Sequence, residues 1–561
     1  MVVRQARAPI LRSVRAQRGS TLRCKGWRQE AILRLLENNM ENAEHPERLI
    51  VYGGIGKCAR NWESYHAIID ALKKLENDET LAVQSGMPVA VFRTHRLAPR
   101  VVMANTNIVH ASWETFYDLQ DKNLTMFAQY TAGPWEYIGT QGVIQGTFQT
   151  LAAIARLRFD DSLVGRVLLT AGMGGMGGNQ PRAMTMHGGV CVCADVDPRA
   201  IERRVQAGYC DVVADSFEHA WKLALAAAEA KKPLGIALLG NAVDVLEEAL
   251  ARDVRPDIIT DMTPCHDPLS YVPSGLTLEE AERLRGTDRP GYVRAAHASM
   301  IRQLTVMNAF FDRGVEVFEY GNQIRGETRV AGFDQALKIP GFVARYIRPL
   351  FTEGRGPFRW ICLSGNPDDL SRLDDLALEL FPDDDLVTKW IRLAREHVPI
   401  EGLPARVCYL AYGQRAAFGL AVNRLVGSGA IECPVAFSRD NLDSGSIVNP
   451  TFESENMRDG SDLISDWPYL NALLNTAAMA DLVAIQANYA MGEAVHTGVT
   501  MIADGTSESE LRLDACLTTD PGIGVVRHAQ AGYERAREVV DEKGIKVPLW
   551  WSPTATFGPE T

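Results

Sequence analysis

The chain has 561 residues, of which 46% are hydrophobic and 23% charged, with a formal net charge of −12. This composition is that of a globular protein of about two to four domains, and it excludes general disorder. The acidic balance argues against a nucleic-acid partner and favours an enzyme with a small-molecule substrate.

Three further patterns limit the class of protein. The ten cysteines are scattered without a CxxC pair, so we expect no metal site and a reducing, cytoplasmic location. No apolar run approaches the roughly 18 residues of a membrane span, so we expect no membrane partner. Residues 1–28 are basic and lack acids. We interpret them as a loosely ordered N-terminus, with a transit peptide as the alternative.

In chain order, the first zone (residues 1–140) predicts amphipathic helices at 27–39 and 65–75. The second zone (141–345) alternates apolar strand patterns with helical ones. Strands are predicted at 166–170, 189–194, 234–239 and 257–260, and helices at 201–207, 217–230 and 242–252. This alternation predicts a parallel sheet with crossover helices. The third zone (346–561) has short apolar runs at 407–410 and 482–485 between glycine-rich loops.

A glycine loop follows the first strand of the second zone. It reads AGMGGMGG at residues 171–178 and contains a GxGxxG pattern that starts at Gly172. Glycines permit a tight turn and close approach of a pyrophosphate, and Asp195, about twenty residues on, can accept hydrogen bonds from ribose hydroxyls. The pattern therefore favours NAD over NADP. A glycine-rich turn without a ligand is the alternative, and the motif alone would suit a dehydrogenase.

Several segments together resemble the urocanase (urocanate hydratase) family. They occur in the family's order over residues 18–506. The segments are YGGIGKCARNW (52–62), QYTAGPW (129–135), YIGTQGVIQG (137–146), LTAGMGGMGG (169–178), YGN (320–322), YIRPLF (346–351), GPFRW (356–360), YGQR (412–415), DGSD (459–462) and SDWP (465–468).

The resemblance implies an α/β protein in which a Rossmann-type NAD-binding domain (141–345) is inserted into a larger mixed α/β core domain (1–140 and 346–561). It also implies a homodimer. The implied reaction adds water to a urocanate-type imidazole acrylate and gives an imidazolone propionate, with tightly held NAD+ acting as an electrophile without net redox change. The implied cofactor-binding residues are Gly53, Gly54, Gln129, Gly175, Met176, Gly177, Asp195, Asn241, Ala242, Thr263, Pro264, Cys265, His266, Tyr271, Tyr320 and Gly492.

Three catalytic candidates are carried over by the same motifs. Cys408 takes the place of the family's active-site cysteine, and nearby Arg406 or Arg415 could lower the pKa of its thiol. Arg359 would hold the substrate carboxylate as a bidentate fork, and Asp443 would act as a general acid or base. The alternatives are a buried core cysteine, a surface ion pair and a turn or helix-cap aspartate, respectively.

The chain departs from the family pattern at three places. The family usually has HHGGG before VGMG, DQTSAH and HLDCG, whereas this chain has IQANYAMG (485–492), DMTPCH (261–266) and NLDSG (441–445). Either a true urocanate hydratase has drifted, or the ring pocket now admits a substituted imidazole. We favour the second interpretation, with S-methylthiourocanate as the leading substrate. An NAD-dependent dehydrogenase and a non-catalytic NAD-binding sensor remain alternatives.

Overall fold

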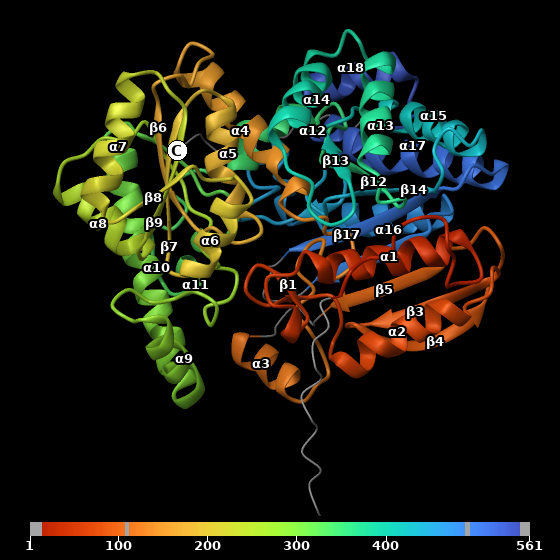
Figure 1. The fold of residues 1–561 in the computed structure, drawn as a ribbon, viewed down its shortest axis with the longest axis horizontal. Coiled ribbons are helices and arrows are strands. Elements are labelled where there is room, and N and C mark those ends of the chain that lie inside the picture. Colours follow the sequence, from red (N-terminus) through yellow and green to blue (C-terminus); the bar gives the residue numbers. More distant parts are fainter. Residues whose placement is uncertain (1–13, 107–111, 488–493, 550–561) are drawn as a thin grey trace, which may run out of the picture.

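The computed structural model describes residues 14–106, 112–487 and 494–549, and its two large sheets lie in neighbouring bodies (Figure 1). The N-terminal elements are α1 (Trp27–Glu41), η1 (Pro46–Arg48), β1 (Ile50–Tyr52), β2 (Gly56–Lys57), α2 (Trp62–Lys74), β3 (Glu79–Gln84), β4 (Met87–Arg93), β5 (Val101–Thr106) and α3 (Trp113–Asp121).

The middle of the chain forms a six-stranded sheet in the order β11-β10-β6-β7-β9-β8, and every paired strand in it is parallel. Its elements are η2 (Thr140–Gly142), α4 (Ile144–Arg158), β6 (Val167–Ala171), η3 (Gly177–Asn179), α5 (Gln180–Met186), β7 (Val190–Asp195), α6 (Pro198–Gln206), β8 (Val212–Ala214), α7 (Phe217–Glu229), β9 (Leu234–Leu239), α8 (Ala242–Ala251), β10 (Ile258–Ile259), α9 (Leu278–Thr287), α10 (Arg289–Asp312), β11 (Glu316–Val317) and α11 (Ile324–Val330). The strand order reverses at β6, where a doubly wound sheet places its ligand.

The remaining elements build most of a nine-stranded mixed sheet, β13-β12-β14-β17-β16-β5-β3-β4, with β15 paired to β17. They are η4 (Val343–Ile347), α12 (Arg348–Phe351), β12 (Phe358–Cys362), α13 (Pro367–Leu380), α14 (Asp385–His397), β13 (Ala405–Cys408), α15 (Gln414–Gly427), β14 (Val435–Arg439), β15 (Ile447–Val448), η5 (Ser461–Leu463), α16 (Asp466–Ala477), β16 (Leu482–Ala487), β17 (Val495–Ala503), α17 (Ser507–Gln530) and α18 (Glu534–Lys543). Strand β16 pairs in parallel with β5, so segments from the two ends of the chain share one sheet.

The α/β fold class and the predicted parallel sheet are confirmed, and the predicted strands occur as β6, β7, β9 and β10. Two predicted helices begin three residues earlier than their apolar pattern. Helix α2 begins after Asn61, whose side chain accepts a hydrogen bond from the Ser64 N–H at 2.7 Å. Helix α6 begins after Asp197, which caps it through the Arg199 N–H. The capping side chains, rather than the apolar residues, fix these helix starts.

The prediction of a loosely ordered basic N-terminus is wrong from residue 14 onward. Arg18 pairs with Glu41 at 2.7 Å, and Arg23 pairs with Glu30 at 3.0 Å, both on α1. These ion pairs attach the N-terminal segment to α1, so Arg18 and Arg23 have a structural role. Residues 1–13 lie outside the described residues. Within the described part of the chain, the helices lack the length and apolarity that crossing a membrane requires.

Candidate active site

A cavity of about 890 Å³ opens where the carboxyl edge of the six-stranded sheet meets loops of the other body. Its volume lies in the upper part of the range of roughly 300–1,000 Å³ that ligand pockets occupy. One part is lined by the glycine loop and the loops after β7, β9 and β10. The other part reaches loops of the nine-stranded body, so a single cavity joins the two bodies.

The glycine loop after β6 leaves no room for side chains at two positions. Gly172 has a φ of +88°, and a Cβ there would collide with the Met262 carbonyl. A Cβ on Gly177 would collide with the carbonyl oxygen of Gly172. The N–H of Gly175 donates to the Glu44 carboxylate, which shows that the loop can bind an anionic oxygen. These are the properties of a loop that brings its backbone close to a phosphate.

Asp195 ends β7 at the edge of the cavity. One carboxylate oxygen accepts the Met173 N–H at 2.6 Å, and the other accepts the Asp197 N–H at 2.8 Å. Burial raises the pKa of Asp195 to about 6. Each oxygen keeps a lone pair, so the carboxylate can accept hydroxyl groups of a ribose.

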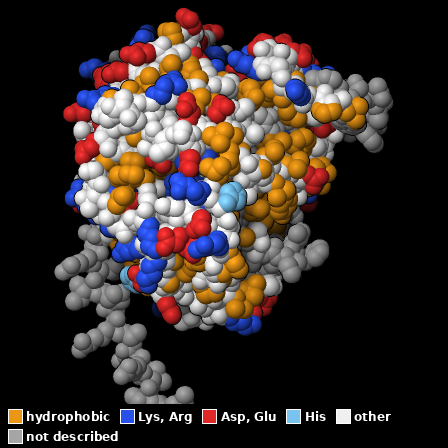
Figure 2. Space-filling view, turned by 90° about the vertical axis from the view of Figure 1, so that its right-hand side faces the viewer, with side chains coloured by type: hydrophobic (Ala, Val, Ile, Leu, Met, Phe, Trp, Pro, Cys, Tyr) orange, Lys and Arg blue, Asp and Glu red, His pale blue; other side chains and the backbone are white. Residues whose placement is uncertain are grey.

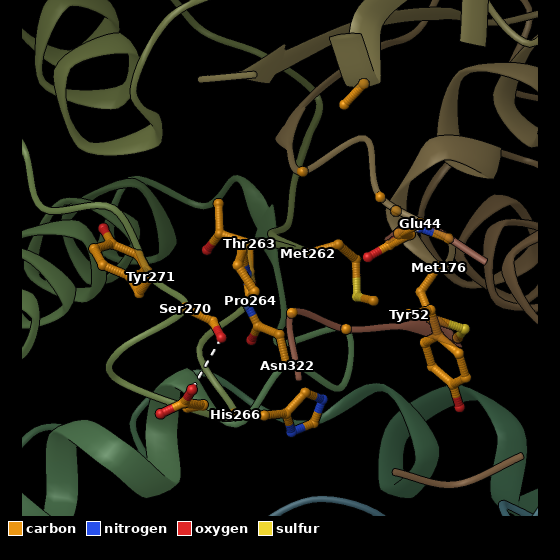
Figure 3. A pocket seen from close by; sticks show the side chains of 18 of the residues that line it. Glu44, Tyr52, Met176, Met262, Thr263, Pro264, His266, Ser270, Tyr271 and Asn322 are labelled. Atoms are coloured by element: carbon orange, nitrogen blue, oxygen red, sulfur yellow. Dashed lines mark hydrogen bonds between the residues drawn. The ribbon is translucent and has the colours of Figure 1, made fainter. Parts of the chain in front are cut away.

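Most of the predicted cofactor residues come together around this cavity (Figure 3). Those that line it are Gly53, Gly54, Gln129, Gly175, Met176, Gly177, Asp195, Asn241, Ala242, Thr263, Pro264, His266, Tyr271 and Tyr320. Cys265 is buried just behind the lining, with its sulfur 3.3 Å from the Thr263 hydroxyl. Gly492 lies outside the described residues.

Four cavity-lining residues have buried side-chain polar atoms without a partner among the described residues: Oε1 of Gln129 and Nδ1 of His266, both predicted cofactor residues, and Nε of Arg285 and Oε2 of Glu453. Burial lowers the pKa of His266 to about 4, so its ring is neutral at pH 7. A buried polar atom without a partner costs about 1–3 kcal/mol, which a bound ligand can recover. With the glycine loop and Asp195, the atoms of Gln129 and His266 fit a dinucleotide.

The part of the cavity beside the nine-stranded body is rich in aromatic rings, of which Tyr52 also borders Gly175 of the glycine loop. Its rings are Tyr52, Tyr130, Tyr320, Phe342, Tyr409 and Phe452, and its carboxyl groups belong to Asp440 and Glu453. Neither carboxyl group is predicted from the sequence. Asp440 could have been considered because it lies three residues before Asp443 in the same loop, but Glu453 gave no motif signal.

Arg359 is fully buried on β12 and is not among the residues that line the cavity. Its Nη2 donates to Asp440 Oδ2 at 2.7 Å and to the Gly142 carbonyl at 3.0 Å. Nε also reaches the Gly142 carbonyl, and Nη1 donates to the Glu136 carbonyl at 3.4 Å. Four of the five guanidinium donors are thus in use. The sequence predicts that the Arg359 guanidinium binds a substrate carboxylate with two parallel hydrogen bonds, but in this arrangement it is not free to do so. The alternative, a surface ion pair, differs as well, because the ion pair of Arg359 with Asp440 is buried.

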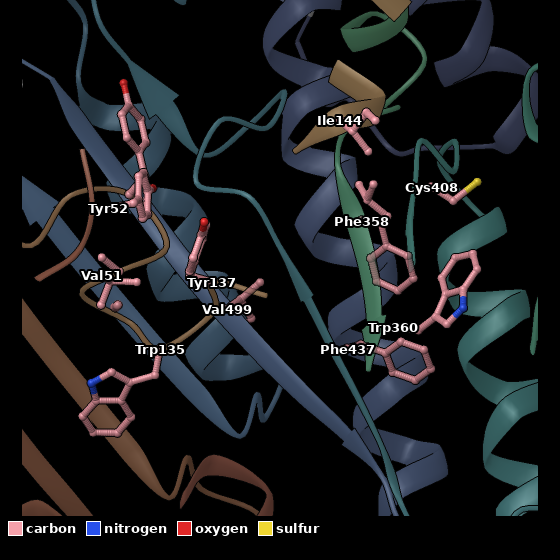
Figure 4. Close-up of a cluster of buried hydrophobic side chains, with 14 of the residues drawn as sticks. Val51, Tyr52, Trp135, Tyr137, Ile144, Phe358, Trp360, Cys408, Phe437 and Val499 are labelled. Atoms are coloured by element: carbon pink, nitrogen blue, oxygen red, sulfur yellow. The ribbon is translucent and has the colours of Figure 1, made fainter. Parts of the chain in front are cut away.

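Cys408 ends β13 inside the hydrophobic core, near Phe358 and Trp360 (Figure 4), and does not line the cavity. The expected lowering of its thiol pKa is wrong, because burial raises that pKa. Arg406 donates to Asp374 at 2.7 Å. That pairing leaves the thiol without a dominant cationic neighbour, which is the situation of an inert core cysteine.

Asp443 is also held away from the cavity. Its two oxygens accept Nη1 and Nη2 of Arg415 at 2.6 and 3.0 Å, and Nε of Arg439 lies 3.4 Å away. The Ser444 N–H donates to the same carboxylate at 2.8 Å. Asp443 therefore anchors the loop that presents Asp440.

Three family models match the chain in sequence order. The urocanase N-terminal domain matches residues 14–136, the urocanase Rossmann-like domain matches 139–346, and the urocanase C-terminal domain matches 349–542. The glycine loop and Asp195 lie in the second match, and Asp440 and Glu453 in the third. The chain belongs to the urocanase family.

Proposed function

We propose that the chain is a hydratase that uses bound NAD+, without net redox change, to add water to a urocanate-type imidazole acrylate. Family membership indicates hydratase activity on urocanate-like substrates. The observation that carries the proposal is the single cavity, which has a dinucleotide-type loop at one part and an aromatic, carboxyl-bearing pocket at the other. Such a cavity can hold a cofactor and a flat conjugated substrate together.

The residues that would hold the cofactor follow from the geometry. Backbone N–H groups of the glycine loop would meet the phosphates, and the Asp195 carboxylate would accept ribose hydroxyls. The unpartnered atoms of Gln129 and His266 would gain hydrogen bonds. When bound, NAD+ supplies a cationic ring that withdraws electrons from a conjugated partner.

The aromatic pocket would bind and orient the acrylate. Tyr52, Tyr320 and Tyr409 are nearly completely buried and offer flat faces to a planar ring. The Asp440 carboxylate faces the same space and can accept a proton from an attacking water molecule. Excluding bulk water from such a pocket strengthens these polar contacts.

In this proposal the three sequence candidates act through neighbouring groups. Arg359 fixes Asp440 and the Gly142 carbonyl, and Asp443 fixes the loop that carries Asp440. Cys408 packs in the core directly before Tyr409, whose N–H donates to Gln145 at 3.0 Å. Arg359 and Asp443 are therefore positioning residues, and Cys408 is a core residue.

We further propose that the substrate ring carries a substituent, with S-methylthiourocanate as the leading candidate. Two departures from the family pattern meet behind one wall of the pocket. Asn441 Nδ2 lies 2.8 Å from His496 Nδ1, and Gln486 Nε2 lies 3.3 Å from the same nitrogen. The His496 ring stacks on Tyr130 with centroids 4.9 Å apart. A change at either position therefore acts on the wall formed by Tyr130.

The test is a substrate panel of urocanate, 2-thiourocanate, S-methylthiourocanate and N-methylurocanates, ranked by kcat/KM with no cofactor added. We expect purified protein to release NAD+ on denaturation and to consume the ultraviolet absorbance of a ring-substituted substrate. Turnover of urocanate alone would identify a true urocanate hydratase. NADH formed in equal amount with product would identify a dehydrogenase, and no turnover of any compound would refute the hydratase.

We also propose that residues 141–345 form the inserted domain, that 1–140 and 346–561 form the core domain, and that the protein is a cytoplasmic homodimer. The pairing of β16 with β5 supports the two-part core. All ten cysteines are free, which suits a reducing compartment.

Exposed apolar side chains support the dimer. Figure 2 shows hydrophobic side chains crowded over part of one face. Among the described residues, η5, α16 and the two-residue segment between them expose Leu463, Ile464, Tyr469, Leu470, Leu473 and Leu474. Such a patch marks an interface. We expect light scattering to give a dimer and Leu473→Glu to weaken it; an unchanged mass would exclude α16 from the interface.

A further inference from the structure

The two carboxyl groups in the aromatic pocket have opposite surroundings. Asp440 has a cationic partner, because Arg359 donates to it at 2.7 Å. Glu453 forms no ion pair with any described residue. Its Oε1 accepts the Tyr130 hydroxyl at 2.6 Å, and its Oε2 has no partner within the described residues. Two carboxyl groups that share one site but differ in this way suit opposite acid and base roles.

The surroundings of Glu453 favour its neutral form. Glu453 lines the cavity although the residue is only 2% exposed. Burial raises the pKa of Glu453 well above its ordinary value; the charges of Glu319 and Asp440 raise it further, while the Tyr130 hydrogen bond lowers it. A carboxyl group whose neutral form is favoured in this way can donate a proton in the pocket.

Tyr130 fixes the acid in place. Its ring is stacked on His496, and its backbone carbonyl accepts Gln486 Nε2 at 2.7 Å. Both the ring and the backbone of Tyr130 are thus held from the side away from the cavity. Since the Tyr130 hydroxyl occupies Oε1 of Glu453, the free Oε2 is the oxygen that can carry the transferable proton.

We propose that Glu453 is the proton donor of the hydration and Asp440 the proton acceptor, a step that rests on the proposed function. The water oxygen forms a C–O bond with a ring carbon of the substrate, and one water O–H bond breaks, with its proton going to Asp440. The electron pair of the ring C=C bond moves into the bond between ring and side chain, and the electron pair of the acrylate C=C bond takes the proton of Glu453 and forms a C–H bond. A later shift of the ring-carbon proton to the side chain gives the imidazolone propionate. Proton return from Asp440 to Glu453 restores both groups, so one water molecule is consumed and no electrons are exchanged.

The main test is Glu453→Gln, which preserves size and an acceptor for Tyr130 but cannot give up a proton. We expect kcat to fall by about 10²–10⁴-fold, the range for a lost general acid, and KM to change little. A general acid works only when protonated, so wild-type kcat should fall as pH rises through the pKa of Glu453. That alkaline limb should disappear in the variant.

Tyr130→Phe provides a second, independent readout. It removes the hydrogen bond that lowers the pKa of Glu453, so the alkaline limb should move to higher pH while turnover persists. Glu455→Gln is the matched control: it changes a buried glutamate two residues away that pairs with Arg325 and does not line the cavity. It should retain kcat and the alkaline limb.

Two outcomes would overturn the role of Glu453. The first is a Glu453→Gln enzyme that retains kcat with a raised KM, which would make Glu453 a binding group. The second is an alkaline limb that stays in place in Tyr130→Phe, a result that remains decisive if Glu453→Gln does not fold. Failure of the proposed function is distinct, since wild-type enzyme would then turn over no compound of the substrate panel.

Discussion

Replacing Cys408 by alanine separates a core role for this thiol from a chemical one. The side chain is fully buried on β13, and the residue is not part of the cavity lining. The change removes one heavy atom of roughly methylene size, worth about 0.8 kcal/mol of transfer free energy. A remaining void of roughly 30 Å³, about one water volume, adds a cavity cost of similar size. We therefore expect unfolding free energy to fall by about 1–2 kcal/mol.

The expected effect on turnover is small. Since the thiol does not face the cavity, kcat/KM of Cys408→Ala should stay within about threefold of wild type, whereas loss of a group that transfers protons costs about 10²–10⁴-fold. Cys362→Ala on the neighbouring strand β12 is the matched control, because Cys362 is also buried and outside the cavity lining. Urea unfolding, retained NAD+ and steady-state kinetics should be measured on both variants.

One result would refute this reasoning. If Cys408→Ala folds, retains NAD+ and loses turnover by more than about a hundredfold while Cys362→Ala does not, the thiol takes part in the reaction. The inner end of the pocket would then have to open to Cys408 when substrate binds. Thiol labelling gives a parallel check: because all ten cysteines are buried, the native protein should react slowly and the denatured protein should show ten thiols.

Three further predictions concern the buried charges and the glycine loop. Arg359→Met should destabilise the fold by about 3–5 kcal/mol, because it leaves the Asp440 carboxylate buried without its partner. Adding Asp440→Asn should recover part of that loss in urea unfolding; additive losses would contradict the pairing. Burial raises the pKa of Glu136 well above its ordinary value, so the folded state holds its proton more tightly than the unfolded state. The free energy of unfolding of the wild type should therefore decline as pH rises above about 4.3. The free energy of unfolding of Glu136→Gln, measured relative to wild type, should be larger at pH 8 than at pH 5. A difference between the two proteins that does not change with pH would contradict this. Gly177→Ala should fold but lose bound NAD+, because its Cβ would meet a carbonyl oxygen of the same loop; full NAD+ content on denaturation would contradict the cofactor site.

The long apolar elements could be predicted from sequence because their patterns are locally complete. Strands β7 and β9 are nearly continuous apolar runs, as expected for parallel strands covered on both faces. Two strands of the same sheet are not predicted. Val212–Ala214 is short and partly exposed, and Glu316–Val317 has two residues, of which one is a charged residue buried by pairing with Arg345 at 2.8 Å. Neither segment is long enough to show the alternation of apolar and polar residues by which a strand is predicted from sequence.

The cofactor half of the candidate site was more predictable than the catalytic half. The glycine loop and Asp195 are set by spacing along one strand–turn–helix unit, so sequence positions translate into geometry. The choice between Asp440 and Asp443 is different. It depends on Arg359 from β12 and Arg415 from α15, which bind the two carboxylates from different sides. Nothing in the local sequence of the loop tells which arginine reaches which aspartate.

The departures from the family pattern are separated in sequence but act on one wall of the pocket. Asn441 and Gln486 both approach His496, and neither side chain lines the cavity. His496 in turn stacks on the ring of Tyr130. Tyr130 lines the pocket, and its hydroxyl group donates to the Glu453 carboxyl group. A change behind this wall can therefore alter the space beside the substrate ring while Asp440 and Glu453 stay in the pocket. Under the proposed function, this separation would let substrate preference change while the hydration itself is retained.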